Sequence, residues 1–393
     1  MKNKQTQCEP AITLSAGPVG VYPRVLRAMS TTVQYDFDPY FQEFYELVNR
    51  KVSKALKIEE PALILHCEPA PGIEAAAASL ISKDDVVLNL ASGVYGKGFG
   101  YWASRYNKEL IEIEVPYNES ISPDQVEAAF EARKDIRIVS AVHHDTPSGT
   151  LNPIKEIGEI VKANGALLLV DAVSSWGGMD IHPKDCSADI FITSPSKCLG
   201  GAPGLTLMSV SDAAWDHIGQ NSAAPFASIL SLTDWRNAWR HDQPFPFTPS
   251  VAEINGLDAA IDNYLEEQPE KVWERHKKTA DACRAGIKAM GCKLWATSEA
   301  IASPTTTAVA IPDGIKDEDI RMTARNIFGV TFSSGRNETM GKLLRIGHMG
   351  MVAQPIYALV AITALGGALN YLGYKTNTAA GIEAATAVIT DLS

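Results

Sequence analysis

The amino-acid sequence predicts an α/β protein, in which a large domain built on a mostly parallel sheet precedes a smaller C-terminal α+β domain. The chain has 393 residues, enough for two or three domains of about 100 to 200 residues each. From about residue 60, short apolar runs alternate with amphipathic segments, as they do in βαβ units. A stretch rich in proline and aromatic residues, 243–250, ends this alternation. We therefore expect residues 1–255 to form an N-terminal segment and the large domain, and residues 256–393 to form the small domain.

Each predicted strand of the large domain is a short apolar run. These runs are residues 62–66, 86–90, 111–115, 136–144, 166–173, 188–193 and 205–210. Helices are expected between them, for example at 72–81 and 122–133. The second has Ser122 at the cap, Pro123 at its first position and Gln125 three residues on, which is a start signal. In the small domain we expect a long helix after residue 250 and strands near 305–311, 330–333 and 343–346.

The composition favours a globular protein that acts on small molecules. Hydrophobic residues make up 46% of the chain and charged residues 21%, which excludes extended disorder. The 35 Lys and Arg against 46 Asp and Glu give a net charge of -11, the wrong sign for a nucleic-acid partner. No C-x-x-C pair occurs, so we expect free thiols in a reducing compartment. The six cysteines are Cys8, Cys67, Cys186, Cys198, Cys283 and Cys292.

Neither end of the sequence predicts a membrane association. Residues 1–10 are polar and lack the apolar run of a signal peptide. The most apolar stretch, 356–369, has 14 residues, short of the roughly 18 to 20 that span a bilayer. We expect a cytoplasmic protein with no membrane partner.

A lysine and an aspartate follow neighbouring strands in a pattern that suits Schiff-base chemistry. The run 166–170 leads into Asp171 (DAVSS), and the run 189–193 leads into Ser-Pro-Ser-Lys197 and a loop rich in glycine and proline. Ligands of such sheets collect at the carboxyl ends of the strands. Loss of water around a lysine lowers its pKa and frees the amine to attack a carbonyl. An acid on the adjacent strand can hold the protonated ring nitrogen of a pyridoxal-type electron sink. Taken alone, an aspartate at a strand end is more often a helix cap, and a lone lysine is more often a solvated loop residue. The two together, in this order on successive strands, favour a role in Schiff-base chemistry.

Several motifs in order resemble class V aminotransferases of pyridoxal-phosphate fold type I, the serine-pyruvate and alanine-glyoxylate group. They are residues 15–19 (SAGPV), 171–175 (DAVSS), 197–199 (KCL) and 345–347 (RIG), and the resemblance runs from about residue 14 to 385. It implies that Lys197 forms the aldimine with the cofactor and carries a proton between a cofactor carbon and a substrate carbon. It also implies that Asp171 pairs with the ring nitrogen, Tyr95 stacks on the ring and Thr146 bonds near the ring hydroxyl.

Two arginines of the small domain are candidates for the substrate carboxylate. The resemblance assigns this role to Arg345, because a planar guanidinium donates two parallel hydrogen bonds to a carboxylate. Arg336 is a candidate for a second carboxylate contact or an ordering contact in its loop, with a surface ion pair as the alternative. The run His143, His144 and Asp145 invites a metal interpretation, but neighbouring histidines in a strand point to opposite faces. We therefore expect no metal.

The sequence departs from the family where the cofactor phosphate should bind. Family members use a Ser-Gly turn at a helix N-terminus, whereas residues 66–72 here read HCEPAPG. Glu68 puts a carboxylate at the phosphate position, and Pro69 and Pro71 remove two backbone donors. Two like charges about 4 Å apart repel by about 4 kcal/mol at an effective dielectric near 20. Two further residues with which the family contacts the phosphate are also missing. The family often has Gln directly before the lysine, where this sequence has Ser196, and it has a tyrosine at a position that falls at or near Phe245 here.

The sequence keeps the residues that contact the ring but lacks those that contact the phosphate. In this it resembles a member of the group that takes unphosphorylated pyridoxamine as a substrate in vitamin B6 degradation. This implies transamination between pyridoxamine and pyruvate, giving pyridoxal and L-alanine, with no tightly bound cofactor. Glu68 would then accept a hydrogen bond from the hydroxymethyl group of the vitamin, unless it is simply an acid favoured at a helix N-terminus. The alternatives are a pyridoxal-phosphate-dependent alanine or serine aminotransferase and a non-catalytic pyridoxal-binding protein. The family also implies a homo-oligomer, a dimer or a tetramer.

Overall fold

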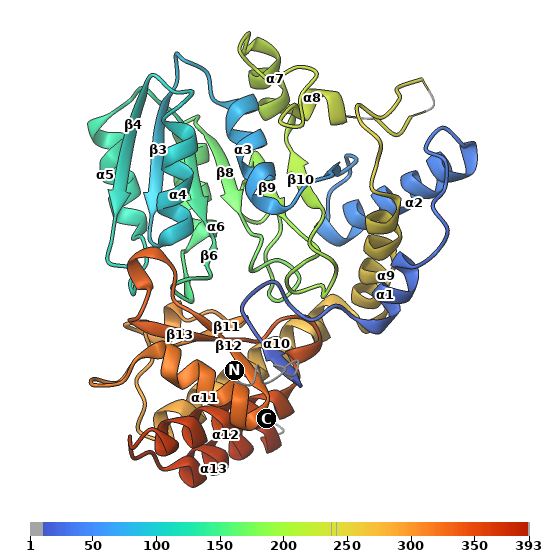
Figure 1. The fold of residues 1–393 in the computed structure, drawn as a ribbon. Helices are drawn as coiled ribbons and strands as arrows, with labels where there is room; N and C mark the ends of the chain where they lie inside the picture. Colours follow the sequence, from blue (N-terminus) through green and yellow to red (C-terminus); the bar gives the residue numbers. More distant parts are fainter. Residues whose placement is uncertain (1–10, 237, 241, 392–393) are drawn as a thin grey trace, which may run out of the picture.

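The computed structural model, which describes residues 11–391 except 237 and 241, confirms the predicted α/β class (Figure 1). The large sheet has seven strands in the order β2-β10-β9-β8-β5-β3-β4. β10 runs antiparallel to the other six strands of this sheet, which are parallel to one another. All seven predicted strands are present, with ends within two residues of the prediction. They are β2 (Leu63–Leu65), β3 (Val86–Ala91), β4 (Glu109–Glu114), β5 (Ile136–Val142), β8 (Leu167–Asp171), β9 (Ile190–Thr193) and β10 (Thr206–Val210).

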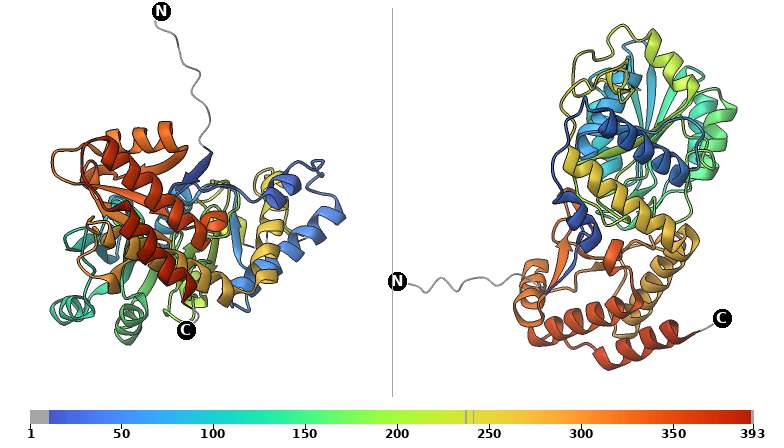
Figure 2. Two further views of the ribbon diagram at one scale, coloured as in Figure 1. Left: turned by 90° about the horizontal axis from the view of Figure 1, so that it is seen from below. Right: turned by 90° about the vertical axis from the view of Figure 1, so that its right-hand side faces the viewer.

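Helices cover both faces of this sheet (Figures 1 and 2). Successive side chains of a strand point to opposite faces, so Leu168 and Val170 of β8 face one core and Leu169 faces the other. The first face carries α2 (Pro39–Leu56), α5 (Pro123–Ala132), α6 (Ile154–Ala163) and α9 (Val251–Glu267). The second carries α3 (Pro69–Leu80), α4 (Val94–Ala103), α7 (Asp212–Gln220) and α8 (Leu232–Trp235). The start signal predicted for α5 is confirmed, since Ser122 and Gln125 form a capping box.

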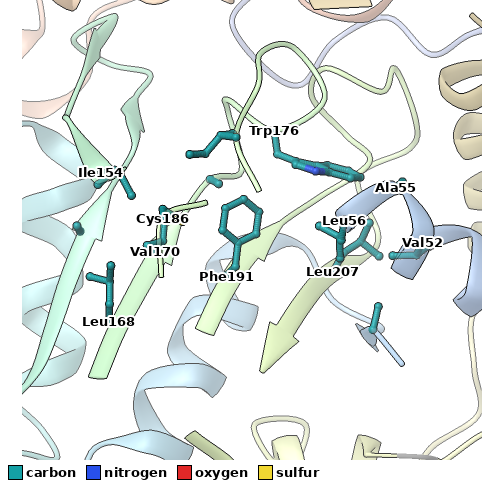
Figure 3. Close-up of a cluster of buried hydrophobic side chains, with 14 of the residues drawn as sticks. Val52, Ala55, Leu56, Ile154, Leu168, Val170, Trp176, Cys186, Phe191 and Leu207 are labelled. Atoms are coloured by element: carbon teal, nitrogen blue, oxygen red, sulfur yellow. The ribbon is translucent and has the colours of Figure 1, made fainter. Parts of the chain in front are cut away.

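The first of these cores holds large side chains from the strands and from distant helices. Figure 3 shows Trp176, Phe191 and Leu207 there, with Val52 and Leu56 of α2 beside Leu207. Trp176 is 1% exposed and Phe191 0% exposed. This packing fixes the segments that follow β8 and β9, where the candidate site residues lie.

The small domain is built on a four-stranded sheet in the order β1-β12-β13-β11. Its strands are β1 (Ile12–Leu14), β11 (Thr306–Ala310), β12 (Val330–Ser334) and β13 (Leu343–Gly347), and its helices are α10 (Pro269–Ala289), α11 (Asp317–Phe328), α12 (Pro355–Tyr371) and α13 (Thr378–Thr390). The three predicted C-terminal strands are present, whereas β1 was not predicted. The division at residue 255 stays a prediction; β1 pairs across it with β12, and α9 spans it.

Several short elements lie between the strands and helices described above. They are α1 (Pro23–Met29), the pair β6 (His144–Asp145) and β7 (Thr150–Leu151), and the 3-10 helices η1 (Glu299–Ile301), η2 (Asn337–Thr339) and η3 (Gly350–Val352). The most apolar stretch of the sequence lies in α12, whose inner face is buried in the small core. No helix in the described part of the chain is both long and apolar enough to cross a membrane. Five of the cysteines are free thiols, and Cys8 lies outside the described residues.

Candidate active site

Four of the predicted site residues come from four neighbouring strands of the large sheet. Asp171 ends β8, Lys197 follows β9, and Tyr95 and Thr146 lie after β3 and β5. These strands are parallel, so their carboxyl ends meet at one edge of the sheet. In Figure 1 this edge faces the small sheet. The site therefore lies where the two domains meet.

Lys197 is a partly buried lysine held next to the N-terminal segment. Its Nζ donates a hydrogen bond to the carbonyl oxygen of Ala16 at 3.2 Å. Gly17 has a φ of +124°, and a Cβ there would lie 1.9 Å from this Nζ, so only glycine fits. Burial, together with the charge of Arg345, lowers the pKa of Lys197 to about 8, while the charges of Asp171 and Glu68 act in the opposite direction. Near neutral pH, Lys197 is therefore a neutral, nucleophilic amine in a useful fraction of the protein molecules.

Asp171 provides a carboxylate at the end of the adjacent strand. Burial raises its pKa to about 6 and the charge of Asp145 acts in the same direction, while Lys197 and the Val173 N–H lower it. The Val173 N–H donates to Asp171 Oδ1 at 2.9 Å. At neutral pH this group is mostly ionised, so it can pair with a protonated ring nitrogen.

Tyr95 and Arg336 are joined although they come from different domains. Arg336 Nη1 donates to the Tyr95 hydroxyl at 3.2 Å, and its guanidinium lies 5.6 Å from the centre of the ring. The second arginine, Arg345 on β13, donates from Nε to the carbonyl oxygen of Ser334 at 2.9 Å. Within the described residues its two terminal nitrogens form no hydrogen bond or ion pair. These nitrogens are free to bind a carboxylate in the bidentate manner.

The segment after β5 is a network of buried polar groups. Thr146 is 0% exposed and its hydroxyl lies 2.6 Å from that of Ser174. His143 Nδ1 lies 2.9 Å from the Ser175 hydroxyl, whereas His144 Nδ1 lies 3.0 Å from the carbonyl oxygen of Ser174. Burial lowers the pKa of both histidines, to about 4 and about 3. Both histidines are therefore neutral side chains, and each has its own hydrogen-bond partner.

The start of α3 is a poor place for a phosphate group. Glu68 is the N-cap residue of α3, it is exposed, and its side chain makes no capping bond. Pro69 occupies the first turn and cannot donate. The charge of Glu68 acts on Lys197, raising the pKa of that lysine, so the carboxylate and the amine belong to one electrostatic neighbourhood.

Two further positions agree with this mismatch. The Ser196 hydroxyl lies 2.9 Å from that of Ser194, and Phe245 packs its ring against Tyr45 with centroids 5.0 Å apart. Phe245 carries no hydroxyl with which to reach an anion. The residues at this end of the site do not fit the phosphate of pyridoxal phosphate, whereas Lys197 and Asp171 fit the pyridine ring of the vitamin.

Some residues near this site were not predicted to take part in it. Asp145 was considered only as a metal ligand, yet it is completely buried next to Tyr95. Ala16 and Gly17 contact Lys197 from 181 and 180 residues away, and only the SAGPV motif pointed to that segment. Ser174, which contacts both Thr146 and His144, belongs to the DAVSS motif, but nothing in the motif singled it out.

The sequence is similar to known aminotransferases along almost its whole length. The family model of aminotransferase class-V matches residues 23–356. The pyridoxamine–pyruvate transaminase of Mesorhizobium japonicum is 62% identical over 381 residues, which cover 97% of each chain. An uncharacterised aminotransferase of Methanocaldococcus jannaschii is 33% identical over 374 residues, 95% of this chain and 96% of its own.

The fold is also similar to solved structures of such enzymes. A crystal structure of pyridoxamine-pyruvate aminotransferase from Mesorhizobium loti matches with a TM-score of 0.97 and 61% identity, covering 98% of both chains. The ureidoglycine-glyoxylate aminotransferase of Bacillus subtilis matches with a TM-score of 0.92 and 28% identity, covering 98% of this chain and all of the other. The fold is that of the fold type I aminotransferases, as predicted, and the chain belongs to the class V aminotransferase family.

Proposed function

We propose that this protein transfers the amino group of pyridoxamine to pyruvate, giving pyridoxal and L-alanine, as a step of vitamin B6 degradation. The identity of 62% to a pyridoxamine–pyruvate transaminase supports this activity. The observation that carries the proposal is the start of α3, where a carboxylate and prolines occupy the place of a phosphate cradle beside an otherwise suitable ring site. Pyridoxal and pyridoxamine are then substrates that come and go, and the protein retains no tightly bound cofactor.

Lys197 and Asp171 do the chemistry of the vitamin in this proposal. In the reverse direction, from alanine to pyruvate, the free amine of Lys197 condenses with the aldehyde of pyridoxal and releases water, and the amino group of alanine then replaces the lysine. In the forward direction the same steps run backwards. Lys197 also moves a proton between the methylene carbon of the vitamin and the α-carbon of alanine. Asp171, as a carboxylate, keeps the ring nitrogen protonated, so the ring withdraws electrons from the carbon that loses its proton.

The remaining residues bind and orient the two substrates. Arg345 binds the carboxylate of pyruvate or alanine, because its two terminal nitrogens have no partner within the described residues and burial removes competing water. Tyr95 stacks on the ring, Arg336 gives a second carboxylate contact or orders its loop through Tyr95, and Thr146 bonds near the ring hydroxyl. Glu68 accepts a hydrogen bond from the hydroxymethyl group, where a phosphorylated vitamin would place its negative charge.

The proposal extends to the assembly and location of the protein. Fold type I active sites are usually completed by a partner subunit, so we propose a homo-oligomer, a dimer or a tetramer. The acidic net charge and the free thiols support small-molecule work in the cytoplasm, with no nucleic-acid partner.

Product analysis with a matched pair of variants tests the function. The protein is given pyridoxamine and pyruvate without pyridoxal phosphate, and pyridoxal and L-alanine are measured over time. The two products should appear in equal amounts, Lys197→Ala should form neither, and Lys184→Ala, an exposed lysine paired with Glu59, should behave as the parent. If the parent binds pyridoxal but forms no product, the protein is a non-catalytic vitamin-binding protein. If it is active only with added pyridoxal phosphate, it is an ordinary aminotransferase that depends on this cofactor.

A further inference from the structure

The helix that carries Tyr95 is capped by a side chain from another strand. Its N-cap residue is Gly93, which has no side chain, and α4 has no acidic residue in its first turn. Asp145 on β6 fills this role, because its Oδ2 accepts hydrogen bonds from the Tyr95 N–H at 2.7 Å and from the Gly96 N–H at 3.2 Å. A carboxylate at this end satisfies free amides and suits the positive end of the helix.

The fit between Gly93 and Asp145 is tight. A Cβ at Gly93 would lie 2.2 Å from Cγ of Asp145, so the carboxylate occupies the space that a larger cap residue would need. Asp145 is 0% exposed. The start of α4 is thus shaped around this one side chain, and the backbone of Tyr95 is held by it.

Asp145 is also close enough to groups of the candidate site to interact with them electrostatically. Its Oδ1 is buried and has no hydrogen-bond partner among the described residues. Burial raises the pKa of Asp145 to about 6, against its backbone hydrogen bonds and the charge of Arg345. Burial is also the main reason why the pKa of Asp171 is raised, and the charge of Asp145 adds to that rise. The carboxylate therefore lies in the same neighbourhood as the groups assigned to the ring nitrogen and to the substrate carboxylate.

We propose that Asp145 is a positioning residue that sets Tyr95 over the vitamin ring. Tyr95 is held at both ends, with its backbone N–H on Asp145 and its hydroxyl on Arg336. Without Asp145, two backbone amides in the first turn of α4 lose their acceptor. The backbone of Tyr95 is then held less firmly, and so is the position of its ring. This inference rests on the proposed function, since Tyr95 matters only if the vitamin stacks on it.

Truncation and rescue at position 145 separate positioning from general stability. Asp145→Ala and Asp145→Ser should each weaken pyridoxal binding and raise the KM for pyridoxamine about tenfold, the loss expected when a capping acceptor is removed. The KM for pyruvate should stay within about twofold. Asp145→Asn keeps an acceptor oxygen of the same reach and should recover most of the affinity. Asn377→Ala, which removes the cap that accepts from Ala380 at 3.1 Å on α13, is the control and should change neither KM.

A double-mutant cycle with Tyr95→Ala decides whether Asp145 acts through Tyr95. If it does, truncating Asp145 in the Tyr95→Ala background should change pyridoxal binding by less than about twofold. An undiminished effect in that background, equal losses for pyridoxamine and pyruvate, or truncations that do not fold while Asp145→Asn does would overturn the proposal. Pyridoxal binding is measured by its own absorption, so a parent that binds pyridoxal without transamination would refute the proposed function and still test Asp145.

Discussion

Burial of Lys197 has a direct kinetic consequence. Only the neutral amine attacks an aldehyde, and burial lowers the pKa of this lysine to about 8. Below pH 8 the neutral fraction falls about tenfold per pH unit, because the group titrates as a single base. We predict that the rate of pyridoxal capture rises with pH up to about 8 and then levels off, as followed by stopped-flow absorption. A rate that keeps rising to pH 10, like that of a solvated lysine, would show that the amine is not desolvated.

Arg345 should matter for one substrate and not for the other. Arg345→Ala removes the bidentate partner of the pyruvate carboxylate but leaves the contacts of the ring. We predict about a tenfold to hundredfold rise in the KM for pyruvate and for L-alanine, the cost of losing a charge-assisted pair. The dissociation constant of pyridoxal should stay within about twofold.

The control for this arginine is Arg50→Ala, which removes an exposed arginine paired with Glu46 in α2. Equal losses for pyridoxal and for pyruvate in Arg345→Ala would assign Arg345 a structural role instead, for instance through its bond to Ser334.

The position of a single side chain can be predicted best where that side chain directly follows a strand. Asp171 and Lys197 could be paired because two apolar runs end at them, and parallel strands bring such ends together. Asp145 could not be recognised in the same way. Its partners are backbone amides at positions 95 and 96, about 50 residues away, and a backbone amide leaves no mark in the sequence.

In the proposed function, the start of α3 selects against a phosphate. Glu68→Ser removes the carboxylate, so the affinity for pyridoxal 5'-phosphate should rise relative to that for pyridoxal. Glu68 is exposed in this structure, so water weakens the repulsion to about 1 kcal/mol at 4 Å, and we predict a gain of about fivefold. Pro69 still withholds a donor, which limits the gain.

Competitive binding of the two vitamin forms, followed by absorption, measures this change. The control is Glu74→Ser on the same helix, where the carboxylate pairs with Arg105. Equal affinity for the phosphate in Glu68→Ser and in the parent would show that Glu68 does not face the phosphate position.

The elements themselves were predictable to different degrees. Six of the seven strands of the large sheet are apolar runs that are largely buried, which is a strong local signal, whereas the edge strand β4 (ELIEIE) alternates and is partly exposed. Strand β1 has only three residues and exists because it pairs with β12, more than 300 residues away. Helix α4 contains Gly96, Gly98 and Gly100, which disfavour a helix locally, so its formation depends on packing and on the cap from Asp145.

For the whole molecule, we predict that the purified protein is nearly colourless. The coloured vitamin leaves after each turnover, so the purified protein should absorb little above the protein band. Adding pyridoxal should produce an absorption band through its bond to Lys197, and adding L-alanine should then remove the band and release pyruvate. A yellow preparation with one pyridoxal phosphate per chain, active on alanine without added pyridoxal, would contradict this expectation.

The preference of the protein between the two forms of the vitamin decides whether unphosphorylated pyridoxamine is its substrate. Pyruvate is offered to the parent protein with pyridoxamine and, separately, with pyridoxamine 5'-phosphate, and kcat/KM is measured for each from the formation of L-alanine. The account predicts efficient turnover of pyridoxamine and a kcat/KM for the phosphate lower by at least about tenfold, because the start of α3 offers a carboxylate and too few donors. Equal or faster turnover of the phosphorylated vitamin would contradict it.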